Sequence, residues 1–550
     1  MAASGSGGAA LKQSIQSGYT MVHHANLQGA AAWLGCTMQQ SSREMQKALA
    51  LSNRTHKTLL MNRRNTILGL REEPRMNWGS YFAEAAELEK EIAPFFEARS
   101  KEKEDLEDDA LGQISFQHDL LRPFNHVPFA IAIIAFFKVW LVPAMTVLTP
   151  LLAWIVPYIL LKFVYALPIN QEQYSHILKS LWSGNLFNPE EGLSSLWSGR
   201  SVFQMILFGF SFLQSLVQPV QNAMHLYHTD KVFYGVGKKL VRLGQLVQTL
   251  RAELGPLNGR HAKLSFSLQG MSQHDPRAAF MLVKEQPERL QIILRDLARL
   301  ELLWRISQKG ELNAVRFTAN EFHLEQVLDI SLQNGGTPSS VHLTLGETPH
   351  AVLTGPNGGG KSSFLRSLLQ TVLFAHSFGM APAEEAEVPM LSWIASGLQL
   401  RDTPGELSMF ETEVKFAADC LSIAPNHHGP GLLLFDELFH STNPPDGIRT
   451  AERFLRAVWA KQGLFSIVST HVFSLVESAP AHVRPICCQA ERKEDGTIDF
   501  SYRVEPGICR VSSVETVWNR FGLGGRAAAA AGPRPGPGPQ SLPSEETNAH

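Results

Sequence analysis

Cysteine is scarce in this chain of 550 residues, and its five cysteines follow no repeated spacing. None of them forms a C-x-x-C pair of the kind that structural zinc sites use. A small secreted scaffold held together by disulfides is therefore excluded, and a reducing compartment is favoured. The five residues are Cys36, Cys420, Cys487, Cys488 and Cys509.

An excess of charge of either sign is also lacking, because 49 basic residues face 51 acidic ones and the formal net charge is -2. With a pI near 6.9, the chain has no overall field that would hold nucleic acid or an anionic surface, so any such contact must be local. The first thirty residues contain no basic segment followed by an apolar run. We therefore expect no cleaved signal peptide.

The composition indicates a large folded chain, since 44% of the residues are hydrophobic and a domain averages about 150 residues. Shifts in composition along the chain predict six segments. They are a flexible N-terminus (1–36), a charged helical region (37–124), an apolar segment (125–218), a helical lever-like region (219–310), an α/β domain (311–523) and a disordered tail (524–550).

The apolar segment stands out although the mean hydropathy of the chain is only -0.07. Between residues 125 and 167, only Lys138 and Lys162 carry charge. About 20 apolar residues cross a bilayer core, so this stretch is long enough for a transmembrane hairpin with a turn at Thr149-Pro150, or for one span with an interfacial arm. The alternative is a buried helical core. Aromatic residues that suit an interface are Trp140, Trp154, Tyr158 and Tyr165.

Three further helical stretches follow. Val202 to Val217 is apolar but contains two glutamines, and is interpreted as a third span, an interfacial helix or buried core. After Pro287, apolar residues recur at helical spacing and predict a long amphipathic helix. The stretch from 222 to 254 carries a basic cluster that either contacts a phosphate backbone or forms a solvated face, namely Lys231, Lys238, Lys239 and Arg242.

A glycine-rich loop follows a short apolar strand that ends at Thr354. The loop matches G-x-x-x-x-G-K-[ST], and a helical pattern comes directly after it, as this motif requires. In such a loop the backbone N–H groups surround a phosphate, the lysine reaches the β and γ oxygens, and the hydroxyl ligates Mg²⁺. The sequence thus predicts an ATP site formed by Gly355, Pro356, Asn357, Gly358, Gly359, Gly360, Lys361, Ser362 and Ser363.

Two other strand ends carry residues suited to hydrolysis. The predicted buried strand 431–435 is followed by the acid pair Asp436-Glu437. Asp436 is predicted to bind Mg²⁺, and Glu437 to act as the general base for water. A third strand ends at His471, in a position to sense the γ-phosphate. The sequence therefore predicts ATP hydrolysis. The catalytic residues are Lys361, Glu437 and His471, and the metal ligands are Ser362 and Asp436.

These motifs resemble the MutS family of ABC-type ATPases over about 310–523. The matching stretches are TGPNGGGKSSFLR (354–366), APAEEAEV (381–388), DELFHSTNPPDG (436–447), STHVFSLV (469–476) and the C-terminal stretch 496–517. GELSMFETEVKFAADCL (405–421) is similar to the family's signature segment, which implies that Ser408 reaches the γ-phosphate of a partner subunit. The resemblance implies a three-layer α/β P-loop domain and a head-to-head dimer that encloses two Mg-ATP. It also implies DNA binding in mismatch repair.

The chain departs from the family's pattern in three places. The mismatch-recognition domain has no counterpart, because Phe82 and Glu84 lie in a helical, acidic context. Phe439-His440-Ser441 replaces a glycine-rich loop after the acid pair, and Gly358 stands where the family has a larger residue.

We accordingly expect a dimeric ATPase switch that is tethered to a membrane, has its ATPase domain in a reducing compartment, and has duplex DNA as a partner. One alternative is an ATP-sensing membrane scaffold with little turnover, which the altered loop after the acid pair suggests. A transport-type ABC ATPase is the weaker alternative, because its signature stands directly before the acid pair whereas Ser408 lies well upstream.

Overall fold

The computed structural model describes residues 20–23, 28–50, 57–72, 78–96, 120–175, 199–258, 275–332, 336–398, 407–423, 429–494 and 497–514, with 112, 115, 116, 118 and 518. The tail expected at 524–550 lies outside these residues. The chain divides into two compact units. The first comprises Met1–Gly35, Ser42–Glu72 and Leu303–His550, and the second Cys36–Ser41 and Glu73–Leu302.

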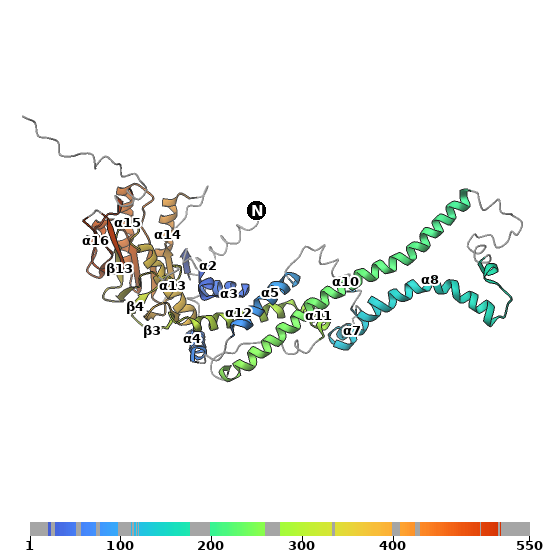
Figure 1. Cartoon of the computed structure of the whole chain (residues 1–550). Coiled ribbons are helices and arrows are strands. Elements are labelled where there is room, and N and C mark those ends of the chain that lie inside the picture. Colours follow the sequence, from blue (N-terminus) through green and yellow to red (C-terminus); the bar gives the residue numbers. More distant parts are fainter. Residues whose placement is uncertain are drawn as a thin grey trace, which may run out of the picture. The chain divides into compact units, whose positions relative to one another are not determined.

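Helices dominate the chain up to residue 308 (Figure 1). The structure has the helices α3 to α5 within the charged region expected at 37–124, and α12 begins at Pro287 as its periodicity predicts. The helices are α2 (Gln28–Leu34), α3 (Gln39–Ala50), α4 (Lys57–Glu72), α5 (Gly79–Phe96), the 3-10 helix η2 (Arg122–His126), α7 (Pro128–Phe136), the π-helix η3 (Phe137–Leu141), α8 (Val142–Ile159), the π-helix η4 (Leu160–Val164), α10 (Gly199–Asn258), α11 (Pro276–Glu285) and α12 (Pro287–Gln308).

The α/β part follows α12. Its strands are β2 (Asn313–Ala314), β3 (Arg316–Thr318), β4 (Glu321–Val327), β5 (Ser339–Thr344), β6 (His350–Thr354), β7 (Met380–Ala381), β8 (Glu385–Pro389), β9 (Trp393–Gly397), β10 (Gly431–Phe435), β11 (Leu464–Ser469), β12 (Val483–Arg492) and β13 (Ile498–Pro506). Its helices are α13 (Lys361–Phe378), α14 (Met409–Ile423), α15 (Pro444–Trp459) and α16 (Phe473–Glu477). The strands predicted before and after the glycine-rich loop are confirmed.

A seven-stranded sheet forms the centre of the first unit, in the order β1-β9-β10-β11-β6-β12-β13. Its pairs are parallel except for the antiparallel β12 and β13. Every residue of β6, β9, β10 and β11 is buried, as continuous apolar strands require in a parallel sheet covered on both faces. Because β10, β11 and β6 are neighbours, their carboxyl ends meet at one edge, where parallel sheets bind ligands.

The edge strand of this sheet comes from the N-terminal part of the chain. β1 (Thr20–His23) pairs in parallel with β9, with Thr20 opposite Ile394. The sequence alone suggests a flexible N-terminus for residues 1–36, whereas the structure has a strand at 20–23 and a helix at 28–34. TMVH is too short for periodicity to reveal a strand, so pairing with a distant strand determines its conformation.

A second, four-stranded sheet has the order β3-β8-β4-β5. β4 pairs antiparallel with both β5 and β8. The register of β4 against β5 shifts between Leu324 and Val327, and Gln326 has a φ of 53° there. Beyond this irregularity Val327 pairs again, with Ser339, and Val327, Asp329 and Leu332 line the cavity described below.

In the second unit, α5 packs against α10 through charged and aromatic contacts. Phe82 is fully buried, and Arg242 forms an ion pair with Glu84. Nζ of Lys239 lies 3.1 Å from Oε2 of Glu91. Phe82 is therefore part of the core of this unit, and Glu84 joins α5 to α10. Within the basic cluster of α10, Lys239 and Arg242 pair with carboxylates.

The apolar segment is helical from Pro128 to Val164, through α7, η3, α8 and η4. The turn expected at Thr149-Pro150 is wrong, because α8 continues through both residues and Thr149 Oγ1 donates to Met145 O at 2.6 Å. A π-helix precedes Pro143, where the missing proline N–H changes the hydrogen-bond pattern. Among the described residues, one stretch, Phe129–Thr149, is long and apolar enough to cross a membrane, and only 17% of its most apolar window is buried.

Candidate nucleotide-binding site

The glycine-rich loop joins β6 to α13. Gly358 and Gly360 have φ values of 83° and 98°, and Gly360 is the N-cap of α13. Gly355, with a φ of 146°, passes so close to β12 that a Cβ atom there would lie 3.0 Å from Cys488 O. Within the described part of the chain, no side chain caps the start of α13. Its first N–H groups are thus available to an anion, and the helix dipole favours negative charge there.

A cavity of about 630 Å³ lies over this loop. Pro356, Asn357, Gly358, Gly360, Lys361, Ser362 and Ser363 line it, whereas Gly355 and Gly359 shape the loop from behind. The rest of the wall includes Val327, Leu332 and Tyr502, which are apolar or aromatic, and the carboxylates Asp329 and Glu437. Among the described residues, three predicted site residues do not line this cavity, namely Asp436, His471 and Ser408. The cavity therefore has an anion-binding floor and a partly apolar side.

Lys361 is folded back onto the loop. Its side chain is 4% exposed, and Nζ donates to Gly355 O at 3.0 Å and to Pro356 O at 3.2 Å. Burial lowers the pKa of Lys361, while the nearby Glu437 and Asp436 carboxylates oppose that shift. Two carbonyl oxygens thus hold an ammonium group that a phosphate oxygen would bind more strongly, because hydrogen bonds between ions are the stronger ones.

The acid pair at the end of β10 is held by a serine on the next strand. Ser469 Oγ donates to Asp436 Oδ1 at 2.5 Å and accepts a hydrogen bond from the Glu437 backbone N–H at 2.9 Å. One hydroxyl therefore fixes both acids. Sequence reasoning missed Ser469. The signal that would have found it is a serine at the end of β11, the strand beside β10.

Glu437 also contacts His471, whose Nε2 lies 3.1 Å from Glu437 Oε1. The hydrogen bond with His471 lowers the pKa of Glu437, burial opposes this, and the charges of His471, Lys361 and His440 assist it. Glu437 has a φ of 54°, a left-handed conformation that costs about 1–3 kcal/mol in a residue other than glycine. Such strain is common where a side chain must face a ligand.

The segment after the acid pair is anchored to α14. Glu413, which is 1% exposed, accepts a hydrogen bond from Ser441 Oγ at 2.6 Å and lies 3.1 Å from Nδ1 of His440. Burial raises the pKa of Glu413, and the contacts with Ser441 and His440 oppose the shift. Phe439 is buried against Phe435 and Phe454. Sequence reasoning missed Glu413, although a glutamate on the apolar face of α14 was a signal.

Ser408 precedes α14 and is exposed. Its backbone N–H donates to Glu411 Oε2 at 2.8 Å, and its Oγ accepts a hydrogen bond from the Glu411 backbone N–H at 3.3 Å, an arrangement known as a capping box. Hydrogen bonding to Ser408 lowers the pKa of Glu411. Ser408 is thus exposed at the start of a helix and does not line the cavity of its own chain.

Residues 351–523 match the family model of MutS domain V. A DNA mismatch repair protein MutS of Streptococcus suis (strain 98HAH33) is 26% identical over 245 residues, which are 42% of this chain and 28% of the relative. A DNA mismatch repair protein HexA of Streptococcus pneumoniae serotype 4 is 26% identical over 249 residues, again 42% and 28%. The chain spans little more than a quarter of the length of these relatives.

The matched residues contain the glycine-rich loop, the acid pair, Ser469 and His471, all at adjacent strand ends of one parallel sheet. The match, the fold and the arrangement of the site agree with one another. The C-terminal part of this chain is therefore identified as a domain V of the MutS family.

Proposed function

We propose that the C-terminal domain binds Mg-ATP and hydrolyses it, and that the ATP cycle drives a switch between open and closed dimers. The observation that carries this proposal is the arrangement of three neighbouring strand ends, two of which contribute residues to one cavity while the third contacts Glu437 in its wall. The glycine-rich loop follows β6, Glu437 follows β10 and His471 follows β11. A loop that only stored a phosphate would not require an ionised carboxylate held by a histidine.

The residues around the loop suit ATP and magnesium. The uncapped start of α13 and the buried Lys361 provide positive charge for the β and γ phosphates. Ser362 and Asp436 provide the hard oxygen ligands that Mg²⁺ prefers, and the bound ion would neutralise the charge that develops on the phosphates. Val327, Leu332 and Tyr502 provide an apolar wall for the adenine base.

Glu437 acts on the water in this proposal. Its lowered pKa keeps the carboxylate ionised at neutral pH, so that one oxygen can accept a hydrogen bond from water while the other binds His471. His471 keeps the carboxylate in place and senses the γ-phosphate. Lys361 releases the loop carbonyls and takes up the phosphate oxygens.

The proposed dimer gives Ser408 a role although it does not line the cavity of its own chain. Its exposed position at the start of α14 supports a role at the γ-phosphate of a second subunit. The contact of Glu413 with Ser441 would then connect that helix to the segment after the acid pair. We infer a homodimer with two shared sites.

The role of this switch is proposed from the relatives, whose names refer to DNA mismatch repair. We infer a role in DNA maintenance with duplex DNA as a partner, without a mismatch-reading pair at Phe82 and Glu84. A salt-titrated duplex-binding assay tests it, since phosphate contacts weaken as salt rises. If the protein does not bind duplex DNA even at low salt, the ATP-sensing scaffold is favoured instead.

A membrane is the second partner that we propose. Phe129–Thr149 leaves most of its large apolar side chains exposed; Phe129 is 76% exposed and Trp140 58%. Trp140 packs on Tyr227 of α10, with ring centroids 5.7 Å apart, and Phe210 and Leu213 on α10 are also exposed. Exposed apolar surface of this extent suits lipid. The protein should resist carbonate extraction, and a variant that lacks 125–217 should become extractable.

ATP binding is tested with Lys361→Ala. Binding of a fluorescent ATP analogue should require Mg²⁺ in the wild type and should weaken at least about tenfold in the variant. Lys493→Ala, an exposed lysine paired with Asp499, is the matched control and should bind normally. Equal binding by Lys361→Ala and the wild type would contradict the proposal.

A further inference from the structure

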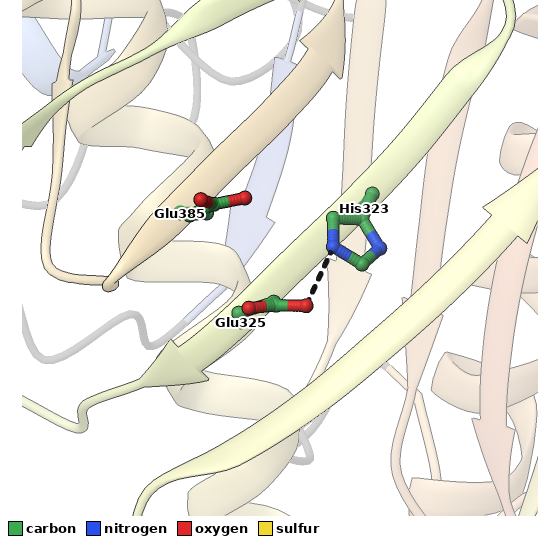
Figure 2. Close-up of side chains that lie close together, drawn as sticks. All are labelled: His323, Glu325 and Glu385. Carbon is green, nitrogen blue, oxygen red and sulfur yellow. Dashed lines mark hydrogen bonds and ion pairs between the residues drawn. The ribbon is translucent and has the colours of Figure 1, made fainter.

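A histidine and two glutamates gather on the four-stranded sheet, outside the lining of the nucleotide cavity. His323 and Glu325 lie on β4, and Glu385 begins the adjacent β8 (Figure 2). Each residue offers one ligand atom, and the three atoms lie within 4.8 Å of one another. Nε2 of His323 is 3.1 Å from Oε1 of Glu325.

The sheet itself brings these three side chains together. Side chains alternate along β4, so His323 and Glu325 share one face while Phe322 and Leu324 are fully buried on the other. The register between β4 and β8 pairs Glu325 with Glu385. The cluster is therefore built on two hydrogen-bonded strands, which hold ligands more firmly than loops do.

In the described part of the chain, His323 is the basic partner within this cluster, and it contacts one of the two carboxylates. Two carboxylates directly opposite each other on neighbouring strands repel. Elsewhere on the same sheet, Glu387 pairs with Arg316, and Glu321 lies 2.8 Å from Nε2 of His342. Among the residues that the structure describes, neither Glu325 nor Glu385 forms an ion pair with lysine or arginine. Nδ1 of His323 is shielded from solvent and has no hydrogen-bond partner there.

We propose that His323, Glu325 and Glu385 bind one divalent transition-metal ion, with water completing its coordination. One imidazole nitrogen and two carboxylate oxygens form a donor set that Zn²⁺ and its neighbours accept, whereas Mg²⁺ prefers oxygen ligands alone. Metal–ligand distances near 2.1 Å separate adjacent tetrahedral ligand atoms by roughly 3.4 Å. His323 and Glu325 already approach this spacing, and the exposed side chain of Glu385 has room to move closer.

The metal ion would connect β4 to β8 close to the nucleotide cavity. None of the three ligands lines the cavity, but Val327, two residues beyond Glu325, does. The proposal does not depend on ATP binding, because its ligands are separate from Ser362 and Asp436. Its consequence is that β4 and β8, the two inner strands of the four-stranded sheet, are held together more firmly when metal is bound.

The test is isothermal titration of Zn²⁺ into the full-length protein, stripped with EDTA, kept in mild detergent and free of nucleotide. The variants are His323→Asn and Glu385→Gln, and the controls are Asp436→Asn in the nucleotide site and Glu452→Gln on α15. The wild type and both controls should bind one Zn²⁺ per chain at this site. His323→Asn and Glu385→Gln should lose this Zn²⁺ or bind it at least tenfold more weakly.

Cobalt(II) provides a second readout. The wild type should develop the visible absorption of a tetrahedral nitrogen and oxygen site, and Glu385→Gln should reduce it. Thermal melting without metal shows whether each variant folds, and Glu385→Gln is exposed and nearly isosteric. Equal stoichiometry and affinity in the wild type and in both folded variants would overturn the proposal, as would loss of the Zn²⁺ site in Asp436→Asn alone.

Discussion

Nε2 of His471 lies 3.1 Å from Oε1 of Glu437, and this contact joins the ends of β11 and β10 at the edge of the nucleotide cavity. The contact orients the Glu437 carboxylate, and the same hydrogen bond lowers the pKa of Glu437. The candidate general base is thus fixed by a residue 34 positions away in the sequence.

His471→Ala should separate turnover from binding. Without the histidine, Glu437 loses its fixed orientation, so we expect kcat for ATP to fall by about tenfold or more while the affinity for ATP changes little. Steady-state ATPase assays and nucleotide titrations measure the two quantities. His228→Ala on α10 is the control. A variant that loses affinity but keeps its kcat would show that His471 only binds nucleotide.

Ser469→Ala should weaken the response to magnesium. Its hydroxyl bonds both Asp436 and the Glu437 backbone, so its loss leaves a backbone N–H without a partner, at about 1–3 kcal/mol. We expect half-maximal turnover to require more Mg²⁺. Ser466→Ala, on the same strand but bonded to His350, should lower stability without this shift. The same Mg²⁺ dependence in both variants would count against a role for Ser469 at the acid pair.

The pair formed by Glu413 and His440 should show coupling. Glu413 is buried and His440 is 56% exposed, so His440→Ala leaves a buried carboxylate without its histidine partner. We expect a loss of about 1 kcal/mol in the free energy of unfolding, and little further loss when Glu413→Gln is already present. Thermal unfolding of both single variants and the double variant measures the coupling. Additive losses would mean that the two side chains do not interact.

Local sequence patterns predicted the parts of the site that depend on neighbouring residues. The strand before Gly355, the helix after Lys361 and the apolar strand before Asp436 all follow from a few consecutive residues. Ser469 and Glu413 could not be assigned in this way, because their roles depend on strand order and on how α14 packs against the segment after β10.

In the helical region, local sequence composition did not predict where helices end. Thr149-Pro150 has the composition of a turn, yet α8 continues through it. The π-helical segments η3 and η4 flank α8 on either side, and their altered hydrogen-bond pattern suits a helix whose prolines lack N–H groups. Similarly, α10 extends from Gly199 to Asn258 across a sharp change in polarity, because helix propensity is indifferent to whether a face meets water or apolar surroundings.

The stability of the domain should depend on the ionisation of Glu437 at low pH. Its pKa is lowered in the folded chain from an ordinary value of 4.5, so its contribution is fully present above pH 4.5 and is lost as pH falls through the folded pKa. The melting temperature of the wild type should therefore exceed that of Glu437→Gln at neutral pH, and the gap should narrow below pH 4.5. Glu452→Gln on α15 is the control. A constant gap across this range would contradict the lowered pKa.

ATP turnover and dimer formation by Glu437→Gln test the central claim most directly. The variant should bind Mg-ATP, lose turnover by about 100-fold or more, and accumulate as an ATP-dependent dimer in sedimentation measurements, whereas the wild type hydrolyses ATP and returns to its open state. A wild type without measurable hydrolysis would contradict the account. So would a Glu437→Gln variant that turns over ATP at the wild-type rate.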